Sequence, residues 1–223
     1  MTFGPGRSGG MVSPYEPAVA LGRSHPRGGR VIGGLILAAG KASRFGRVKQ
    51  LAQLDGRPLL EHSIQAMTAS PVGRVVVVLG AGAEDVIARV DLHGAEPIVC
   101  PRWEEGQAAS LASGLAELSD CDAVVVTLGD MPHLSTNAIR RVIAARTDGV
   151  AAIRATYAGE PGHPVLLERE FFARLRDVSG DHGARNLLLS VNSREIPCDD
   201  LGGGEDVDTP GQLDALRAGG PVA

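Results

Sequence analysis

The feature that most constrains the fold is a regular alternation of short apolar segments with longer amphipathic ones, beginning at residue 31. The apolar segments have the length of β-strands, and the amphipathic segments between them have a helical period. The predicted strands are 31–39, 74–79, 97–100, 123–128 and 150–155, and the predicted helices are 58–69, 83–90, 107–118 and 136–146. Nearly continuous apolar strands that alternate with helices predict an α/β fold, with a mostly parallel sheet covered on both faces.

This fold prediction also places the functional site. In open parallel sheets, ligands bind beyond the carboxyl ends of the strands. The loops that follow Ala39, Leu79, Cys100 and Leu128 should therefore meet at one edge of the sheet. Because no internal repeat or linker divides the chain, residues 31–223 are expected to form a single domain.

The composition excludes several classes of function. With 3% aromatic residues and a formal net charge of -4, the 223-residue chain lacks the stacking side chains and the positive charge that favour nucleic acids or anionic membranes. No apolar run approaches the roughly 20 residues of a membrane helix. The three cysteines are widely spaced and form no CxxC pair, which indicates reduced thiols in a cytoplasmic protein.

The first 30 residues differ from the rest of the chain. They are rich in glycine, proline, serine and arginine, and they show no periodicity. They also lack the apolar core of a secretory signal. We expect residues 1–30 to be a disordered extension that takes no part in the fold.

Residues 35–51, LILAAGKASRFGRVKQL, run from a predicted strand into a loop with two glycines and four basic residues. A glycine-rich turn after a parallel strand directs backbone N–H groups toward the ligand side, where they hold phosphate oxygens. Arg44 and Lys49 would neutralise a triphosphate there. Neither GxxxxGK[ST] nor GxGxxG is present, so a solvated basic loop is an equally good interpretation from spacing alone.

A carboxylate follows a second predicted strand. In VVVTLGDMPHL, residues 124–134, the strand ends at Gly129 and Asp130. One carboxylate at such an edge suits Mg²⁺, which is usually held by one or two acids together with ligand phosphates. The alternative is an aspartate that only stabilises a turn.

Further carboxylates lie near the C-terminus, in GGGEDVDTP, residues 202–210. Glu205, Asp206 and Asp208 precede a helix that is expected to begin near residue 210. Asp208 or Thr209 can cap that helix. Asp206 or Asp208 can equally supply a second metal-binding carboxylate.

Three glycine-containing stretches offer weaker candidates. In WEEGQAASLASGL, residues 103–115, Gln107 and Ser110 can bind a base or ribose, while the alanines favour close packing of the helix. In AGEPGHPVLL (158–167) and SGDHGARNLLL (179–189), His163 and Asp181 can contact a second substrate, and Arg185 can hold a phosphate. A purely structural role is the alternative for each.

Together these motifs resemble a known family. LAAGKASRFGRVKQL is similar to the signature loop of the nucleotidyltransferases with a Rossmann-like fold. WEEGQAASLASGL, GDMP, GHPVLL and DVDTP, in this order and spacing, resemble the molybdenum cofactor cytidylyltransferase (MocA-like) branch of the MobA-like nucleotidyltransferases over roughly residues 34–216. The resemblance implies a Rossmann-like three-layer sandwich of the GT-A-like type. It also implies Mg²⁺-dependent transfer of CMP from CTP to molybdopterin, with release of pyrophosphate, and it favours phosphate binding by the first loop.

The resemblance implies a set of site residues. The catalytic ones are Arg44, Lys49 and Asp130. The nucleotide-binding ones are Leu37, Ala38, Ala39, Gly40, Arg44, Lys49, Gly80, Gln107, Ser110 and Gly129, and the acceptor-binding ones are His163, Asp181 and Arg185. The Mg²⁺-binding ones are Asp130 with Asp206 or Asp208, of which Asp206 is favoured because Asp208 is the expected helix cap.

Other functions stay open at this point. The guanylyl branch usually has a second glycine in place of Ala39, whose methyl group would crowd a purine, so CTP is favoured over GTP. The alternatives are a guanylyltransferase, transfer to another phosphorylated metabolite, or a non-catalytic nucleotide-binding protein that delivers cofactor to a molybdoenzyme or its maturation factor. Members of this group are also called oxidoreductases, but the chain has no dinucleotide fingerprint. Gln50 departs from the family pattern, which has an apolar residue there.

Overall fold

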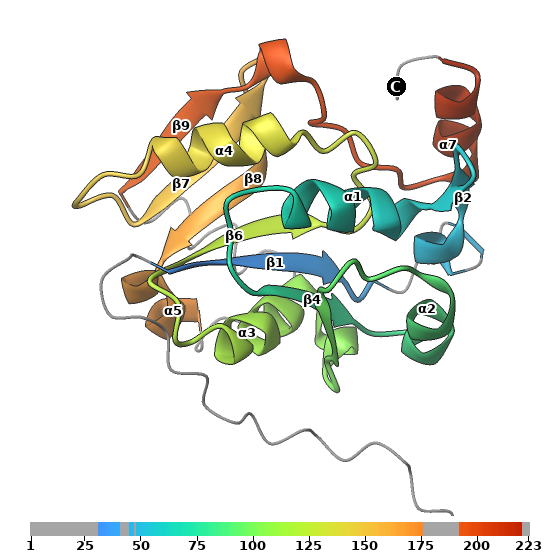
Figure 1. The fold of residues 1–223 in the computed structure, drawn as a ribbon, viewed down its shortest axis with the longest axis horizontal. Coiled ribbons are helices and arrows are strands. Elements are labelled where there is room, and N and C mark those ends of the chain that lie inside the picture. Colours follow the sequence, from blue (N-terminus) through green and yellow to red (C-terminus); the bar gives the residue numbers. More distant parts are fainter. Residues whose placement is uncertain (1–30, 41–44, 47, 176–191, 220–223) are drawn as a thin grey trace, which may run out of the picture.

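A seven-stranded sheet in the order β5-β4-β1-β6-β8-β7-β9 forms the centre of the fold (Figure 1). Its strands are β1 (Ile32–Ala38), β4 (Val75–Leu79), β5 (Glu96–Val99), β6 (Ala123–Leu128), β7 (Ala152–Tyr157), β8 (Glu160–Glu168) and β9 (Ser193–Pro197). This computed structural model describes residues 31–40, 45–46, 48–175 and 192–219. The predicted extension 1–30 and the predicted site residues Arg44, Asp181 and Arg185 lie outside these ranges.

The predicted mostly parallel sheet is confirmed. β1 pairs in parallel with β4 and β6, and β4 pairs in parallel with β5. The predicted strands agree with the observed ones to within two residues at each end. β1 lies in the interior of the sheet, between β4 and β6, because its side chains are apolar on both faces, and Leu35 and Ile36 are fully buried on opposite sides of the sheet.

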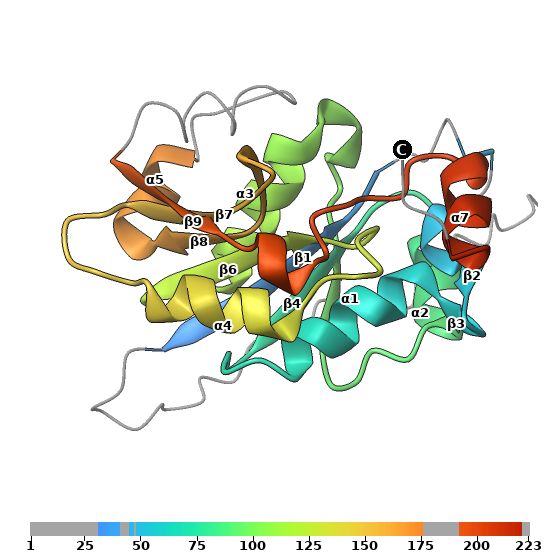
Figure 2. The ribbon, with the colours of Figure 1, turned by 90° about the horizontal axis from the view of Figure 1, so that it is seen from above.

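Helices cover both faces of the sheet and make the fold a three-layer sandwich (Figures 1 and 2). On one face lie α1 (Leu59–Thr68), α2 (Ala83–Arg89) and α4 (Thr136–Ala144), and on the other lie α3 (Gln107–Glu117) and α5 (Arg169–Leu175). Leu60, Ile64 and Met67 recur on α1 with helical spacing, so all three face the sheet and are fully buried.

The sequence did not predict β8 and β9. β8 runs antiparallel to both β6 and β7, and β9 pairs with β7 at the edge of the sheet. β8 begins with Glu160 and contains two prolines, and the residues of β9 are mostly exposed. Neither segment has the apolar pattern by which the other strands were predicted.

A separate small core ties the glycine-rich loop to the C-terminus. Here the hairpin of β2 (Gln53–Leu54) and β3 (Arg57–Pro58) packs beside α7 (Pro210–Arg217) (Figure 1). Its buried members are Phe45, Ala52, Leu54, Leu59, Val207, Leu213 and Leu216. Since Phe45 precedes Lys49 and Val207 lies between two aspartates, this core brings the two predicted ligand-binding segments together. Within the described residues, no helix is long and apolar enough to cross a membrane.

Candidate active site

The ends of β1 and β6 place the first two predicted motifs side by side. Leu37 pairs with Leu128, and the Gly129 amide donates a hydrogen bond to the Leu37 carbonyl at 2.9 Å. A Cβ on Gly129 would lie 2.8 Å from the Cβ of Ala38 and 2.8 Å from a methyl group of Leu60. Gly129 therefore serves close packing of the two strand ends, and Asp130 follows directly at the edge of the sheet.

The three predicted metal-binding carboxylates lie together. Asp130, Asp206 and Asp208 each offer an oxygen within 4.8 Å of the others. Val207 fixes this arrangement: its side chain is fully buried in the small core, and its amide donates a hydrogen bond to the Asp130 carbonyl at 2.9 Å. The carboxylates on either side of Val207 thereby lie next to Asp130. We call these three residues the carboxylate cluster.

The expected helix cap at Asp208 is not observed. Thr209 caps α7 instead: its hydroxyl accepts a hydrogen bond from the Gln212 amide at 3.2 Å, and the Gln212 side chain accepts one from the Thr209 amide at 3.0 Å. This capping box leaves Asp208 to face the cluster. The reason for favouring Asp206 over Asp208 as a metal ligand is therefore removed.

Lys49 joins two members of the cluster. Its ammonium donates hydrogen bonds to Asp130 Oδ2 at 2.6 Å and to Asp208 Oδ1 at 3.0 Å. Burial opposes the charge of Lys49, but the charges and hydrogen bonds of Asp130 and then Asp208 outweigh it, so the pKa of Lys49 lies above its ordinary value. Partial burial, followed by repulsion from Asp130 and Asp208, raises the pKa of Asp206. The cluster thus carries more negative charge than Lys49 neutralises.

The donor set of the cluster fits a hard divalent cation. Asp130 Oδ1 is buried and has no hydrogen-bond partner among the described residues. A buried carboxylate oxygen without a partner is costly unless a cation or water satisfies it. Carboxylate oxygens are the ligands that Mg²⁺ and Mn²⁺ prefer. Asp130, Asp206 and Asp208 are therefore the residues that could hold such an ion.

A first pocket of about 610 Å³ opens beside Asp130. Six of its lining residues belong to the predicted site: Leu37, Ala39, Gly40, Gln107, Ser110 and Asp130. The sequence interpretation missed Trp103, Glu104, Gly106 and Leu128, which also line it. Trp103 and Glu104 belong to the same WEEGQ stretch as Gln107. Their closeness to Gln107 in the sequence could therefore have predicted that they line the same pocket.

Two other predicted nucleotide-binding residues, Ala38 and Gly80, do not line the first pocket but support residues that do. At Gly80 a Cβ would lie 2.4 Å from the Ala39 carbonyl oxygen and 2.8 Å from Trp103 Cγ, so Gly80 lets Trp103 pack against the end of β1. Ala38 is buried on the opposite face of the sheet. Its carbonyl accepts a hydrogen bond from the buried Gln50 amide at 2.5 Å, which explains a polar residue at that position.

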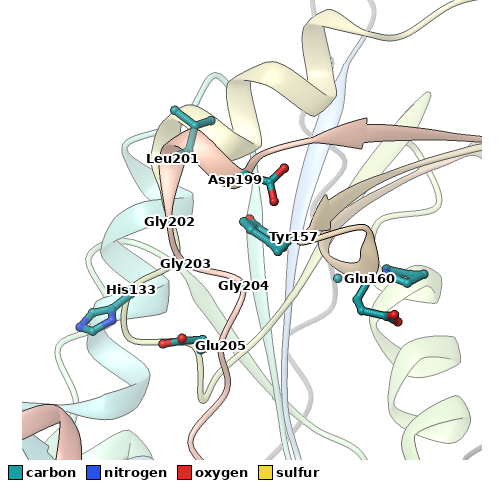
Figure 3. A pocket seen from close by; sticks show the side chains of 11 residues that line it. His133, Tyr157, Glu160, Asp199, Leu201, Gly202, Gly203, Gly204 and Glu205 are labelled. Atoms are coloured by element: carbon teal, nitrogen blue, oxygen red, sulfur yellow. The ribbon is translucent and has the colours of Figure 1, made fainter. Parts of the chain in front are cut away.

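A second pocket of about 590 Å³ lies on the other side of the sheet edge, near β7, β8 and the segment before the cluster. Figure 3 shows the glycine loop between His133 on one side and Tyr157 and Glu160 on the other. The pocket is lined by His133, Tyr157, Glu160, Pro161, Gly162, Asp199, Leu201, Gly202, Gly203, Gly204 and Glu205. Three of these residues carry carboxylates, so the second pocket is acidic.

The glycines of this loop let the backbone pass through a narrow space. Gly203 has a φ of +89°, and a Cβ there would lie 2.1 Å from the His133 carbonyl oxygen. At Gly204 a Cβ would lie 2.5 Å from the ring of Tyr157. The Tyr157 hydroxyl donates a hydrogen bond to the His163 carbonyl at 3.0 Å, which fixes the ring. The loop therefore fits between two fixed surfaces immediately before Asp206.

Of the predicted acceptor-binding residues, the structure describes only His163. This residue lies in β8, is partly buried, and does not line the second pocket, although Gly162 does. Burial, and to a lesser degree the charge of Arg154, lowers the pKa of His163 to about 4. His163 is therefore neutral at pH 7, and its carbonyl accepts the hydrogen bond from Tyr157, which lines the second pocket.

Fold and site are those of an α/β nucleotidyltransferase: a mostly parallel sheet with a carboxylate cluster and two pockets at one edge. The chain belongs to the MobA-like NTP transferase domain family, whose model matches residues 34–195. It is 33% identical over 190 residues to nicotine blue oxidoreductase of Paenarthrobacter nicotinovorans, covering 81% of this chain and 93% of that protein. It is 30% identical over 201 residues to the purine catabolism protein PucB of Bacillus subtilis, covering 82% and 95%.

Solved structures agree with this assignment. Rv0371c of Mycobacterium tuberculosis superposes with a TM-score of 0.75 at 29% identity, covering 84% of this chain and 98% of that one. A second structure of Rv0371c is a complex with manganese, and it superposes with a TM-score of 0.72. A nucleotidyl transferase from Methanothermobacter, with a TM-score of 0.71 at 19% identity, shares the fold.

Proposed function

We propose that the protein is a molybdenum cofactor cytidylyltransferase, which transfers CMP from CTP to molybdopterin in a Mg²⁺-dependent reaction. The observation that carries the proposal is the position of the carboxylate cluster with respect to the two pockets. Asp130 lines the first pocket, and Asp206 directly follows Glu205, which lines the second. A site of this form can hold two substrates with their reacting groups at the cluster.

The first pocket is the proposed site of the nucleotide. Gln107 and Ser110 at the start of α3 offer polar groups to a base or ribose, and Trp103 offers an aromatic wall. Gly40 lies where the chain leaves β1, and a Cβ there would have no atom of the described residues within 4 Å, so these residues leave space beside it for phosphate. The methyl group of Ala39 in the same pocket favours a pyrimidine over a purine.

The carboxylate cluster is the proposed metal site. Asp130, Asp206 and Asp208 would hold Mg²⁺, and the manganese complex of the related Rv0371c supports a divalent ion in this family. The ion would neutralise the α-phosphate and fix the triphosphate for reaction.

The second pocket is the proposed site of the acceptor. Its carboxylates at Glu160, Asp199 and Glu205 suit the N–H donors of a pterin ring, and they would repel a second phosphate in the same place. The acceptor phosphate would then lie toward the cluster and the pterin away from it. The proposed location is the cytoplasm, and the proposed partner that receives the product is a molybdoenzyme or its maturation factor.

The proposed chemistry needs little proton transfer. An oxygen of the acceptor's terminal phosphate attacks the α-phosphorus of CTP, a new P–O bond forms, the α–β P–O bond breaks, and pyrophosphate leaves. Positioning of the two phosphates and neutralisation of their charge by Lys49 and Arg44 would supply most of the rate. Neither a histidine base nor a covalent intermediate has a place in this scheme.

Pyrophosphate release tests the proposal. The protein is incubated with Mg²⁺ and molybdopterin, and CTP, GTP, ATP and UTP are compared in parallel. Release with CTP alone would support the cytidylyl assignment. Release with GTP would keep the chemistry and overturn the interpretation of Ala39, whereas binding of a nucleotide without release would indicate another acceptor or a carrier protein.

A further inference from the structure

Lys49 occupies an unusual place for a residue expected to bind phosphate. Its ammonium lies 2.6 Å from Asp130 Oδ2 and 3.0 Å from Asp208 Oδ1, two of the three residues that can hold a metal ion. Its side chain is only 14% exposed. In the free protein the lysine is thus an internal counter-ion of the carboxylate cluster.

We infer that Lys49 and the divalent cation compete for the carboxylate cluster, and that entry of the metal ion moves the Lys49 ammonium from the cluster to the phosphates of the nucleotide. The competition itself depends only on the geometry of the cluster; the transfer to phosphate rests on the proposed function.

The reason for the competition is electrostatic and geometric. A metal ion binds carboxylate oxygens at about 2.0–2.6 Å, in the space where the ammonium now lies against Asp130 and Asp208. Asp130 Oδ1 is open to a cation, but an ion bound there would share one carboxylate with the ammonium on Oδ2 and would lie close to its charge. Repulsion between two cations in a partly buried site is strong.

The lysine can leave without disturbing the fold. Its four-carbon stem is flexible, and its backbone belongs to a short 3-10 helix, Lys49–Leu51, at the end of the glycine-rich loop. A triphosphate in the first pocket would give the displaced ammonium a new anionic partner. Metal ion and nucleotide should therefore bind cooperatively. The nucleotide phosphates give the displaced ammonium a new partner, and the metal ion frees the ammonium to bind those phosphates.

Amine labelling tests the competition in the unmodified protein. The chain has two lysines, Lys41 and Lys49, so an acylating reagent followed by mass spectrometry reports on Lys49 with Lys41 as a reference. We expect Mn²⁺ alone to raise the labelling rate of Lys49 relative to Lys41 by about fivefold, because the amine loses both carboxylate partners. An unchanged ratio at saturating Mn²⁺ would overturn the inference.

Metal binding by variants gives a second, independent test. Free Mn²⁺ is measured by electron paramagnetic resonance during titration of the wild type, Lys49→Met, Lys49→Arg and Arg74→Met. We expect Lys49→Met to bind Mn²⁺ about tenfold more tightly than wild type and Lys49→Arg to bind it no more tightly. Arg74→Met makes the same change in net charge at the opposite end of β4, where Arg74 pairs with Glu96, and should leave Mn²⁺ affinity unchanged.

The outcomes separate this inference from the proposed function. Equal or weaker Mn²⁺ binding by a folded Lys49→Met variant would show that the lysine supports the metal site and would overturn the competition. If Mn²⁺ releases Lys49 but no nucleotide yields pyrophosphate, the competition stands and the proposed function fails. If CTP yields pyrophosphate while Mn²⁺ leaves Lys49 labelling unchanged, the function stands and the inference fails.

Discussion

The two pockets are nearly equal in volume, about 610 and 590 Å³, but they are built in different ways. The first is formed by the ends of buried parallel strands and by the start of α3, so its walls are part of the main core. The second is formed by the β7–β8 turn and a glycine loop that fits between His133 and Tyr157. One pocket depends on the sheet and the other on a loop. Asp130 of the carboxylate cluster lines the first pocket, and Asp206 directly follows Glu205, which lines the second.

The largest effect is expected from Asp130, the member of the carboxylate cluster that lines the first pocket. Asp130→Asn removes one carboxylate from the cluster and one partner of Lys49, so pyrophosphate release should fall by about 10³-fold or more. The fold should persist, because the buried Oδ1 of Asp130 lacks a hydrogen-bond partner within the described part of the chain. Activity and thermal melting of the variant are compared with Glu195→Gln, which changes an exposed carboxylate on β9. Full activity of Asp130→Asn would contradict the metal assignment.

The next largest effect is a loss of stability from a substitution in the glycine loop of the second pocket. Gly203→Ala places a methyl group against the His133 carbonyl at a φ of +89°, and should lower the free energy of unfolding by about 3 kcal/mol. Gly202→Ala is the control without a clash: its φ of +65° and ψ of -178° are strained for alanine, but the space around its Cβ is open within the described residues, so about 2 kcal/mol should be lost. Urea titrations of both variants measure the difference.

Steady-state kinetics of the same pair then test the division between the pockets. Gly203→Ala should raise the KM for the acceptor while leaving the KM for CTP nearly unchanged, because the first pocket shares no lining residue with the loop. A rise in both KM values would show that the two pockets are not independent.

The same contrast explains what the sequence could predict. Strands buried on both faces have nearly continuous apolar sequences, so β1, β4 and β6 could be located to within two residues. Six of the predicted residues, from the ends of β1 and β6 and from the start of α3, line the first pocket. β8 and β9 were missed because one begins with polar residues and prolines and the other is an exposed edge strand.

The site was harder to predict wherever position depended on packing between distant segments. The choice between Asp206 and Asp208 could not be made from sequence, because it depends on the capping box of Thr209 and on the burial of Val207 in the small core. The second pocket was missed for a similar reason. Its glycines at 202–204 are visible in the sequence, but the surfaces they pass between come from other parts of the chain.

The pH dependence of the free energy of unfolding should test whether the His163 imidazole, in β8 beside the second pocket, is buried. The pKa of His163 is about 4 in the folded protein, below its ordinary value of 6.5, so the unfolded chain binds a proton more tightly. Stability contributed by neutral His163 is fully present above pH 6.5 and is lost as pH falls toward 4. Between pH 7.5 and pH 5 the loss should be about 2 kcal/mol. His163→Gln should reduce this pH dependence in urea titrations, whereas His133→Gln should retain it; equal pH dependence in wild type and His163→Gln would contradict burial of the imidazole.

The smallest effect tests whether the first pocket leaves Gly40 open for a ligand. Gly40 has an ordinary φ, and a Cβ there would meet no atom of the described part of the chain within 4 Å, so Gly40→Ala should change stability by less than about 0.5 kcal/mol. It should nevertheless weaken nucleotide binding about tenfold, since the added methyl group occupies the space proposed for phosphate. Trp103, the single tryptophan of the chain, lines the same pocket, so its fluorescence reports binding directly. Gly211→Ala, equally unobstructed but on α7, is the control and should bind as wild type does. Unchanged affinity in Gly40→Ala would mean that phosphate does not approach the backbone here. Gly40 would then not serve ligand binding in the first pocket, and its role there would differ from the one proposed.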